Sequence, residues 1–232
     1  MEPVEAVAAH KQGLEKSYLV SGGCNTRGQV PLFEKWDHLK VLAERAPLNV
    51  HCGLMEPEAA ARIGSIAETV SFDLVADAGT IQRVYGLELE PECWLRSYRA
   101  LVVHARVIPH ICIGLDAGKI SGEFKALNLL RGEAPEAISF IVFRPTPGTV
   151  FANAPVPSLE ETAAVLVEAR LAFPRTPLYL GCMRPGGRYR GQLDLLAIRA
   201  GINKIVMPAA GARSAAAEMG LNIIDSEECC SL

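Results

Sequence analysis

Seven cysteines are the most reactive residues of this chain, and they stand at positions 24, 52, 93, 112, 182, 229 and 230. Thiolates bind soft metals and iron–sulfur clusters when several of them converge in space. Cys24, Cys52 and Cys182 follow three different expected strands, and Cys112 lies inside another. Because the number is odd and we expect no signal peptide, the pattern favours thiols or metal ligands over disulfides.

The other cysteines differ in their expected roles. Cys93 stands beside Trp94 on an expected helix, where a thiol is most simply a small buried hydrophobe, and the same alternative applies to Cys112. The end of the chain reads Glu-Cys-Cys-Ser-Leu, and its adjacent thiols have no obvious packing role. Cys229 and Cys230 could therefore fold back as ligands.

The histidines give weaker signals. His10, His38 and His104 fall on expected helices and are interpreted as surface or satisfied core residues, whereas His51 and His110 fall on strands and could line an interior. No Ser/His/Asp order and no HExxH zinc pattern is present, so hydrolase chemistry has no positive support, and no catalytic residue is assigned.

These residues are positioned by short β-rich runs that alternate with longer helical runs. Strands are predicted at 17–20, 48–51, 72–75, 108–114, 138–143, 178–180 and 204–207. Helices are predicted near 4–15, 34–45, 57–68, 91–105, 122–131, 158–172 and 191–200. Pro57 suits a first helical turn, and Ser158 with Glu161 forms a capping-box pattern.

About seven βα units predict an α/β fold with a parallel sheet, because the strands are rich in Val, Ile and Leu and show little polar alternation. A closed barrel of this type needs eight strands. We therefore expect one domain over 1–232, an incomplete (βα) TIM-type barrel with the first strand missing and a cysteine-containing tail at 222–232. A doubly wound open sheet is the alternative.

Charge and hydropathy exclude several classes of partner. The 23 basic and 26 acidic side chains are spread along the chain, so no electrostatic footprint for nucleic acid is present. No run reaches the ~18 apolar residues that a membrane span needs. We expect a cytoplasmic protein with no nucleic-acid or membrane partner.

The loops that follow the strands form the active face of a parallel α/β fold. Two of them are rich in glycine, at 21–28 and 114–123, and glycine lets a backbone approach a ligand closely. The second loop lacks the GK[ST] ending of a phosphate-binding P-loop. For Gly22 and Gly23 an ordinary tight turn is the alternative.

Taken together, these loops resemble the biotin-synthase-like branch of the radical S-adenosylmethionine (SAM) superfamily, with its lipoyl-synthase-like relatives, from about Leu19 to the last residue. Ser21-Gly22-Gly23-Cys24 resembles the segment that binds the methionine amino group of SAM. Asp77 resembles the polar residues after the fourth strand, near the ribose. The resemblance implies that a fifth-strand loop supports the adenine and ribose, and the matching residues are Gly118, Ile120, Gly122 and Glu123.

Two later segments, at 144–149 and 181–185, are similar to the sixth- and seventh-strand elements of that branch. The resemblance implies that strand cysteines and a buried arginine hold an auxiliary iron–sulfur cluster. The nearest matches are Cys52, Cys112 and Arg184, with Cys24, Cys182, Cys229 and Cys230 as further candidates.

One departure dominates the interpretation. The CxxxCxxC loop that carries the radical SAM [4Fe-4S] cluster is absent, and no spacing among the seven cysteines reproduces it. Our first hypothesis is a radical SAM-type enzyme domain, truncated or completed by a second polypeptide, that acts on a small-molecule or carrier-bound substrate. The alternatives are a catalytically silent SAM-binding or partner subunit and an unrelated barrel enzyme.

Overall fold

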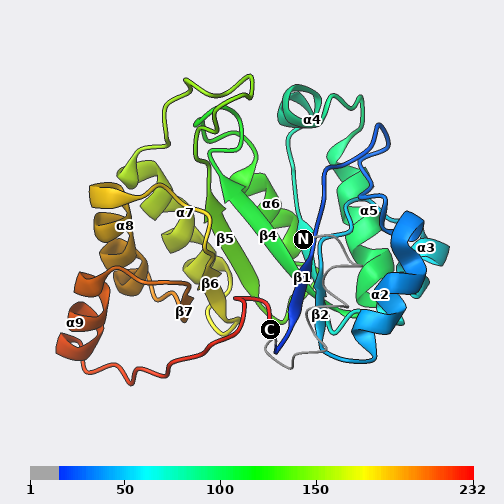
Figure 1. Cartoon of the computed structure of the whole chain (residues 1–232). Coiled ribbons are helices and arrows are strands. Elements are labelled where there is room, and N and C mark those ends of the chain that lie inside the picture. Colours follow the sequence, from blue (N-terminus) through cyan, green and yellow to red (C-terminus); the bar gives the residue numbers. More distant parts are fainter. Residues whose placement is uncertain (1–15) are drawn as a thin grey trace.

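The fold is a half-barrel of seven parallel strands with helices on its outer side (Figure 1). The computed structural model describes residues 16–232, so the helix predicted near 4–15 lies outside the described residues. The strands are β1 (Tyr18–Val20), β2 (Leu48–Val50), β3 (Thr69–Asp73), β4 (Arg106–Ile113), β5 (Ile138–Val142), β6 (Leu178–Leu180) and β7 (Lys204–Ile205).

The strands lie in the sheet in the same order as in the chain, and every neighbouring pair is parallel. This topology confirms the predicted partial barrel. It also excludes the doubly wound alternative, in which the strand order reverses at a switch point. The seven strands match the predicted number of βα units, and the assignment of the missing strand to the first position stays a prediction.

The helices agree with the prediction except at two places. They are η1 (Leu32–Lys35), α2 (Trp36–Ala43), α3 (Pro57–Gly64), α4 (Ala78–Tyr85), α5 (Pro91–Val102), α6 (Glu123–Leu130), α7 (Leu159–Ala172), α8 (Gly187–Arg199) and α9 (Ala210–Glu218). Neither α4 nor α9 was predicted. Both are short, and α9 begins after Ala209, which has no side chain that could cap a helix.

The sheet has two chemically different faces, and the hydrophobic core lies between its convex face and the helices. Val70, Phe72 and Phe140 belong to this core and are at most 1% exposed. The intervening strand residues are polar and buried, namely Asn49, Ser71, His110 and Ser139. The prediction that the strands show little polar alternation was therefore wrong. Polar residues alternate with apolar ones because the concave face of a half-barrel is not packed by a second helical layer. The strand predicted at 72–75 begins earlier for the same reason: it includes the polar Thr69 and Ser71.

The C-terminal segment runs below the sheet, along the amino ends of the strands (Figure 1). Lys204 Nζ at the start of β7 donates to the backbone carbonyl of Cys229 at 2.9 Å, and Ser17 at the start of β1 hydrogen-bonds to Glu228. The predicted tail therefore bridges the two edges of the open sheet. Within residues 16–232, no helix combines the length and apolar character needed to cross a bilayer.

Candidate functional site

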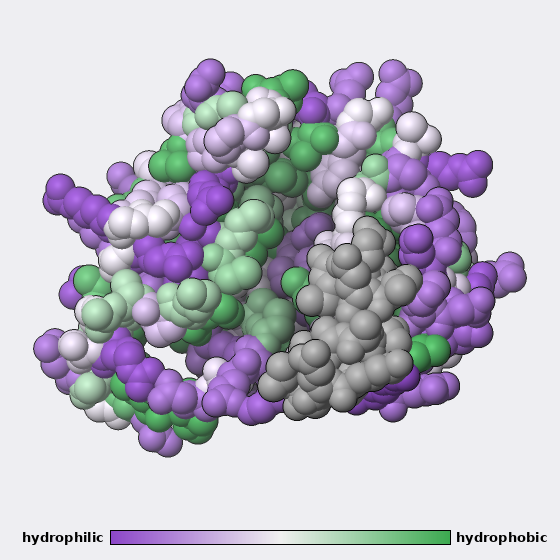
Figure 2. Space-filling model, in the orientation of Figure 1, coloured by the Kyte–Doolittle hydropathy of each residue, from purple (hydrophilic) through white to green (hydrophobic). Residues whose placement is uncertain are grey.

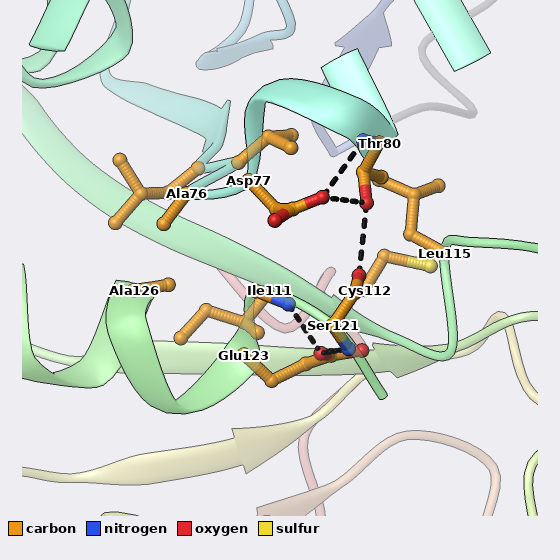
Figure 3. Close-up of a pocket in the computed structure, with 12 residues that line it drawn as sticks. Ala76, Asp77, Thr80, Ile111, Cys112, Leu115, Ser121, Glu123 and Ala126 are labelled. Atoms are coloured by element: carbon orange, nitrogen blue, oxygen red, sulfur yellow. Dashed lines mark hydrogen bonds between the residues drawn. The ribbon is translucent and has the colours of Figure 1, made fainter. Parts of the chain in front are cut away.

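Asp77 marks the carboxyl end of the sheet, where it follows β3 and caps α4. Its Oδ2 atom accepts hydrogen bonds from Thr80 N and Thr80 Oγ1, each at 2.9 Å. Thr80 Oγ1 in turn lies 2.8 Å from Ser121 Oγ in the loop that follows β4 (Figure 3). Through Thr80, the predicted residue Asp77 therefore connects the loops after β3 and β4 at the rim, which is the carboxyl end of the sheet.

The carboxylate of Asp77 keeps one oxygen for a further partner. Its Oδ1 atom has only a long contact of 3.5 Å with Lys125 Nζ. The backbone hydrogen bond from Thr80 and, more weakly, the nearby Lys125 lower the pKa of Asp77, so the side chain is ionised at neutral pH. An ionised carboxylate with a free oxygen at a strand end is a good acceptor for ligand hydroxyl groups.

Glu123 is buried beneath the same loop and acts on the backbone. Its carboxylate accepts hydrogen bonds from the backbone N–H groups of Gly114 at 2.7 Å, Ser121 at 2.8 Å and Gly122 at 3.0 Å. Both oxygens of the Glu123 carboxylate therefore bind the backbone of the loop. In this structure Glu123 shapes the 114–122 loop, and its predicted cofactor-binding role stays a prediction.

The glycines of this loop are explained by close packing. A Cβ atom on Gly122 would lie 3.0 Å from Asp77 Cβ, and one on Gly118 would lie 2.0 Å from the carbonyl oxygen of Pro155. Gly118 also has a φ of +87°, which L-residues rarely adopt. Ile120 is half-buried against the core. The loop is therefore held in one shape by its neighbours.

We expect Gly118→Ala to lower the free energy of unfolding by about 2 to 4 kcal/mol, since it adds left-handed strain to a backbone clash. Gly86→Ala is the matched control, because Gly86 also has a positive φ of +67° but no atom lies within 4 Å of its missing Cβ. Urea unfolding of both variants measures the difference. Equal losses would show that the Pro155 contact does not constrain this loop.

The loop after β1 exposes the backbone of two glycines. Gly22 and Gly23 are exposed, and in the part of the chain that the structure describes their N–H and C=O groups make no hydrogen bond. Beside them a cavity of about 60 Å³ is lined by Cys24, His51, Asp73 and others. The predicted Gly-Gly segment therefore has free donors and acceptors at the same end of the sheet as Asp77.

Asp73 is a site residue that the sequence analysis missed. It ends β3, its side chain is half-exposed, and its Oδ2 atom lies 4.0 Å from His51 Nδ1. It lines the same cavity as Cys24, and its charge contributes, after burial, to raising the pKa values of Cys24, Cys52 and Cys112. A charged residue inside an apolar strand was the signal that could have identified it.

The strand cysteines are neutral thiols in this arrangement. Burial raises the pKa of Cys52 to about 12 and also raises the pKa values of Cys24 and Cys112. Among residues 16–232, no three His, Cys, Asp or Glu side chains form a group that could hold a metal ion. These residues alone do not fit an iron–sulfur cluster, and the ligand roles of Cys24, Cys52, Cys112 and Cys182 stay predictions.

Arg184 is buried after β6 and is occupied by protein partners. Its Nε and Nη2 atoms donate to the Asp194 carboxylate at 2.9 and 3.1 Å, and Nη1 donates to the Gly181 carbonyl at 2.6 Å. Both side chains of the ion pair are 0% exposed. The guanidinium thus anchors the loop after β6 to α8, and its predicted role at a cluster stays a prediction.

Cys229 and Cys230 lie at the opposite end of the barrel from Asp77. The tail folds back onto the barrel, since Cys230 Sγ lies 4.0 Å from His110 Nε2 and Asn49 Nδ2 donates to Cys229 Sγ at 3.4 Å, while the ligand roles of the two cysteines stay predictions. His110 and Asn49 are in the middle of their strands, on the concave face. His110 pairs with Asp73 in the β3–β4 register, and its ring centroid lies 5.5 Å from that of His51. The two histidines therefore separate the tail thiols from Asp73.

Comparison with solved structures identifies the architecture. A structure of methylornithine synthase (PylB) superposes with a TM-score of 0.64 and 14% identity, covering 97% of this chain and 73% of that one. HydG, a maturase of the [FeFe]-hydrogenase, superposes with a TM-score of 0.62 and 16% identity over 88% of this chain. HydG from Carboxydothermus hydrogenoformans gives 0.64 and 14% over the same share. The fold of this chain is the partial TIM-type barrel of these structures.

This likeness shows the fold alone. The chain spans about half the length of the two HydG structures, 48% and 50%. No protein-family model matches the sequence, and no curated protein matches it either. The radical SAM resemblance is therefore supported at the level of the half-barrel, while the biotin-synthase-like branch is a finer prediction.

Proposed function

We propose that this chain is a radical SAM-type barrel domain, related to biotin and lipoyl synthases, that binds SAM across the carboxyl ends of β1, β3 and β4. The observation that carries the proposal is the Oδ1 atom of Asp77, which has a long contact of 3.5 Å with Lys125 Nζ, keeps room for a ligand hydroxyl and lies beside a rigid glycine-containing loop. The exposed backbone groups of Gly22 and Gly23, which follow the carboxyl end of β1, also support the proposal.

The residues fit the polar groups of SAM. The ribose of SAM offers hydroxyl donors that an ionised carboxylate can accept, and its amino group needs acceptors such as the backbone carbonyls of Gly22 and Gly23. The cavity that Asp77 shares with Cys112 and Glu123 is only about 20 Å³, which is close to the space of one water molecule. SAM would therefore lie above this cavity, across the open rim.

We further propose that the thiolates of a [4Fe-4S] cluster come from another segment or a second polypeptide that completes the barrel. The support is that the described residues hold no group of three metal ligands. The substrate, a small molecule or a carrier-bound group, would then enter from the open side of the half-barrel.

Titration calorimetry of the whole chain with SAM tests the proposal. We expect Asp77→Asn to weaken SAM binding by about 10-fold, which corresponds to about 1.4 kcal/mol, because it removes the charge of the ribose acceptor. Asn is also a good helix N-cap, so α4 should persist. Asp37→Asn is the matched control, since Asp37 is an exposed carboxylate on α2. Absence of SAM binding, or equal affinity of both variants, would contradict the proposal.

A catalytically silent SAM-binding subunit is the second candidate. It is favoured by the sequence, in which no cysteine spacing reproduces the CxxxCxxC loop. Anaerobic iron–sulfur reconstitution followed by iron counting tests whether this chain itself holds an auxiliary cluster. Iron that is lost on Cys52→Ala and Cys182→Ala supports the enzyme, whereas SAM binding that stays iron-free even with a partner polypeptide present supports the silent subunit.

A further inference from the structure

The C-terminal tail holds two adjacent thiols in a fixed position at the base of the barrel. Lys204 Nζ donates to the carbonyls of Cys229 at 2.9 Å and Leu232 at 3.0 Å, and Arg106 Nη1 donates to the carbonyl of Ser231. Ser71 Oγ also lies 3.0 Å from Ser231 Oγ. Contacts from three different strands thus fix the backbone on which both cysteines stand.

The two thiols have different surroundings. Cys229 Sγ lies 3.9 Å from Cys230 Sγ and accepts a hydrogen bond from Asn49 Nδ2. Cys230 is 6% exposed and lies 3.8 Å from Ser139 Oγ. Cys229 is half-buried, whereas Cys230 is buried behind it. Cys229 is thus the sulfur of the pair that a small molecule would reach first.

Cys229 also borders a cavity of about 560 Å³ between α8, β7, α9 and the tail. In Figure 2 this region is hollowed at the lower left, between α9 and the C-terminal segment. Its wall combines apolar side chains such as Ile202 and Ile223 with the polar Lys204 and Glu228. A volume of a few hundred Å³ with mixed lining is typical of small-molecule sites.

We propose that Cys229 and Cys230 form a redox-active dithiol that reduces a small disulfide bound in this cavity. The inference is independent of the proposed SAM site, which lies at the other end of the strands. The sulfurs need to close from 3.9 Å to the ~2.05 Å of a disulfide bond. The Cα atoms of adjacent residues lie ~3.8 Å apart, closer than the ~4.4 Å or more of most disulfides, so the backbone at 229–230 has to move together with the side chains.

The exchange takes place in two steps. The Cys229 sulfur attacks one sulfur of the small disulfide, so the S–S bond of the small molecule breaks, a mixed disulfide forms and the first thiolate leaves. The Cys230 sulfur then attacks the Cys229 sulfur, forms a bond between the adjacent cysteines and releases the second thiolate. The protons of the two cysteines end on the two leaving thiolates, so each chain is oxidised by two electrons and each small disulfide yields two thiols.

His110 is placed to position the thiol of Cys230. Its Nδ1 atom lies 2.9 Å from the backbone carbonyl of Ile108, so Nδ1 carries the ring proton and Nε2 is the acceptor that faces Cys230 Sγ. Burial lowers the pKa of His110, so the ring stays neutral and its Nε2 atom can accept a hydrogen bond from the Cys230 thiol. His110 acts here as a positioning residue for the Cys230 sulfur in the second step.

Reaction of the reduced full chain with bis(2-hydroxyethyl) disulfide, followed by alkylation and tryptic mass spectrometry, tests the proposal. The tryptic peptide that follows Arg213 covers 214–232 and contains only Cys229 and Cys230 as cysteines. We expect this peptide to resist alkylation and to lack two hydrogen atoms. Cys230→Ser should stop at the mixed disulfide, and Cys229→Ser should lose the fast reaction.

Cys93→Ser is the control, because Cys93 lies on α5, away from the tail, and this variant should react as the unchanged chain does. The proposal is overturned if the 214–232 peptide stays doubly alkylated, or if Cys229→Ser reacts at the rate of the unchanged chain. It is also overturned if the peptide resists both reagents until a chelator is added, since the two thiols would then hold a metal.

Discussion

Replacing Asp194 by Ala is expected to lower the free energy of unfolding by about 3 to 5 kcal/mol, because the guanidinium of Arg184 would remain buried without a counter-charge. Both partners are 0% exposed, and the carboxylate also accepts a hydrogen bond from the backbone N–H of Ala209 at 2.8 Å. The substitution therefore removes three contacts that join β6, α8 and the loop before α9. Urea unfolding at neutral pH measures the loss.

Two further variants separate the buried charge from simple loss of a salt bridge. Asp225→Ala breaks the exposed Arg213–Asp225 pair and should cost less than about 1 kcal/mol. The double variant Arg184→Met/Asp194→Leu removes both charges and should recover most of the stability lost in Asp194→Ala. Similar losses for Asp194→Ala and Asp225→Ala would refute this account of the loop after β6.

Replacing Glu123 by Ala is expected to cost about 3 kcal/mol or more, since three backbone N–H groups would lose their acceptor at once. These donors belong to Gly114, Ser121 and Gly122, which define the rim loop beside Asp77. Chemical unfolding gives the stability, and hydrogen exchange of 114–122 should show the loop opening in the variant.

Glu161→Ala is a suitable control for that experiment. Glu161 also binds backbone and hydroxyl groups, in the capping box with Ser158, but it is exposed, so its loss should cost only about 1 kcal/mol. If Glu123→Ala costs no more than Glu161→Ala, water must replace the buried carboxylate, and the loop does not depend on it.

Much of the fold could be predicted because local patterns determine it. Short runs rich in Val, Ile and Leu and period-3.6 hydropathy predict the order of strands and helices, and the Ser158–Glu161 capping box forms as predicted. The helix α4 was not predicted, because it is short and has too few periodic positions. The bounds of β3 were wrong because its polar residues face a concave interior, which the sequence pattern does not reveal.

The candidate site was predictable only in part. Strand ends meet at one rim in any parallel sheet, which is why Gly22 and Asp77 were identified. The roles of Glu123 and Arg184 depend on which neighbours their atoms reach, and these contacts are long-range or set by the loop conformation. The place of Cys229 depends on how the tail crosses from β7 to β1, and no local pattern encodes that path.

Hydrogen–deuterium exchange of the full chain with and without SAM shows whether SAM binds across the carboxyl ends of the strands. This binding predicts slower exchange at 21–24, 76–80 and 114–122 when SAM is present, with no change in the C-terminal peptide 214–232. Unchanged exchange at these three rim segments at saturating SAM, or protection confined to other parts of the chain, would contradict it.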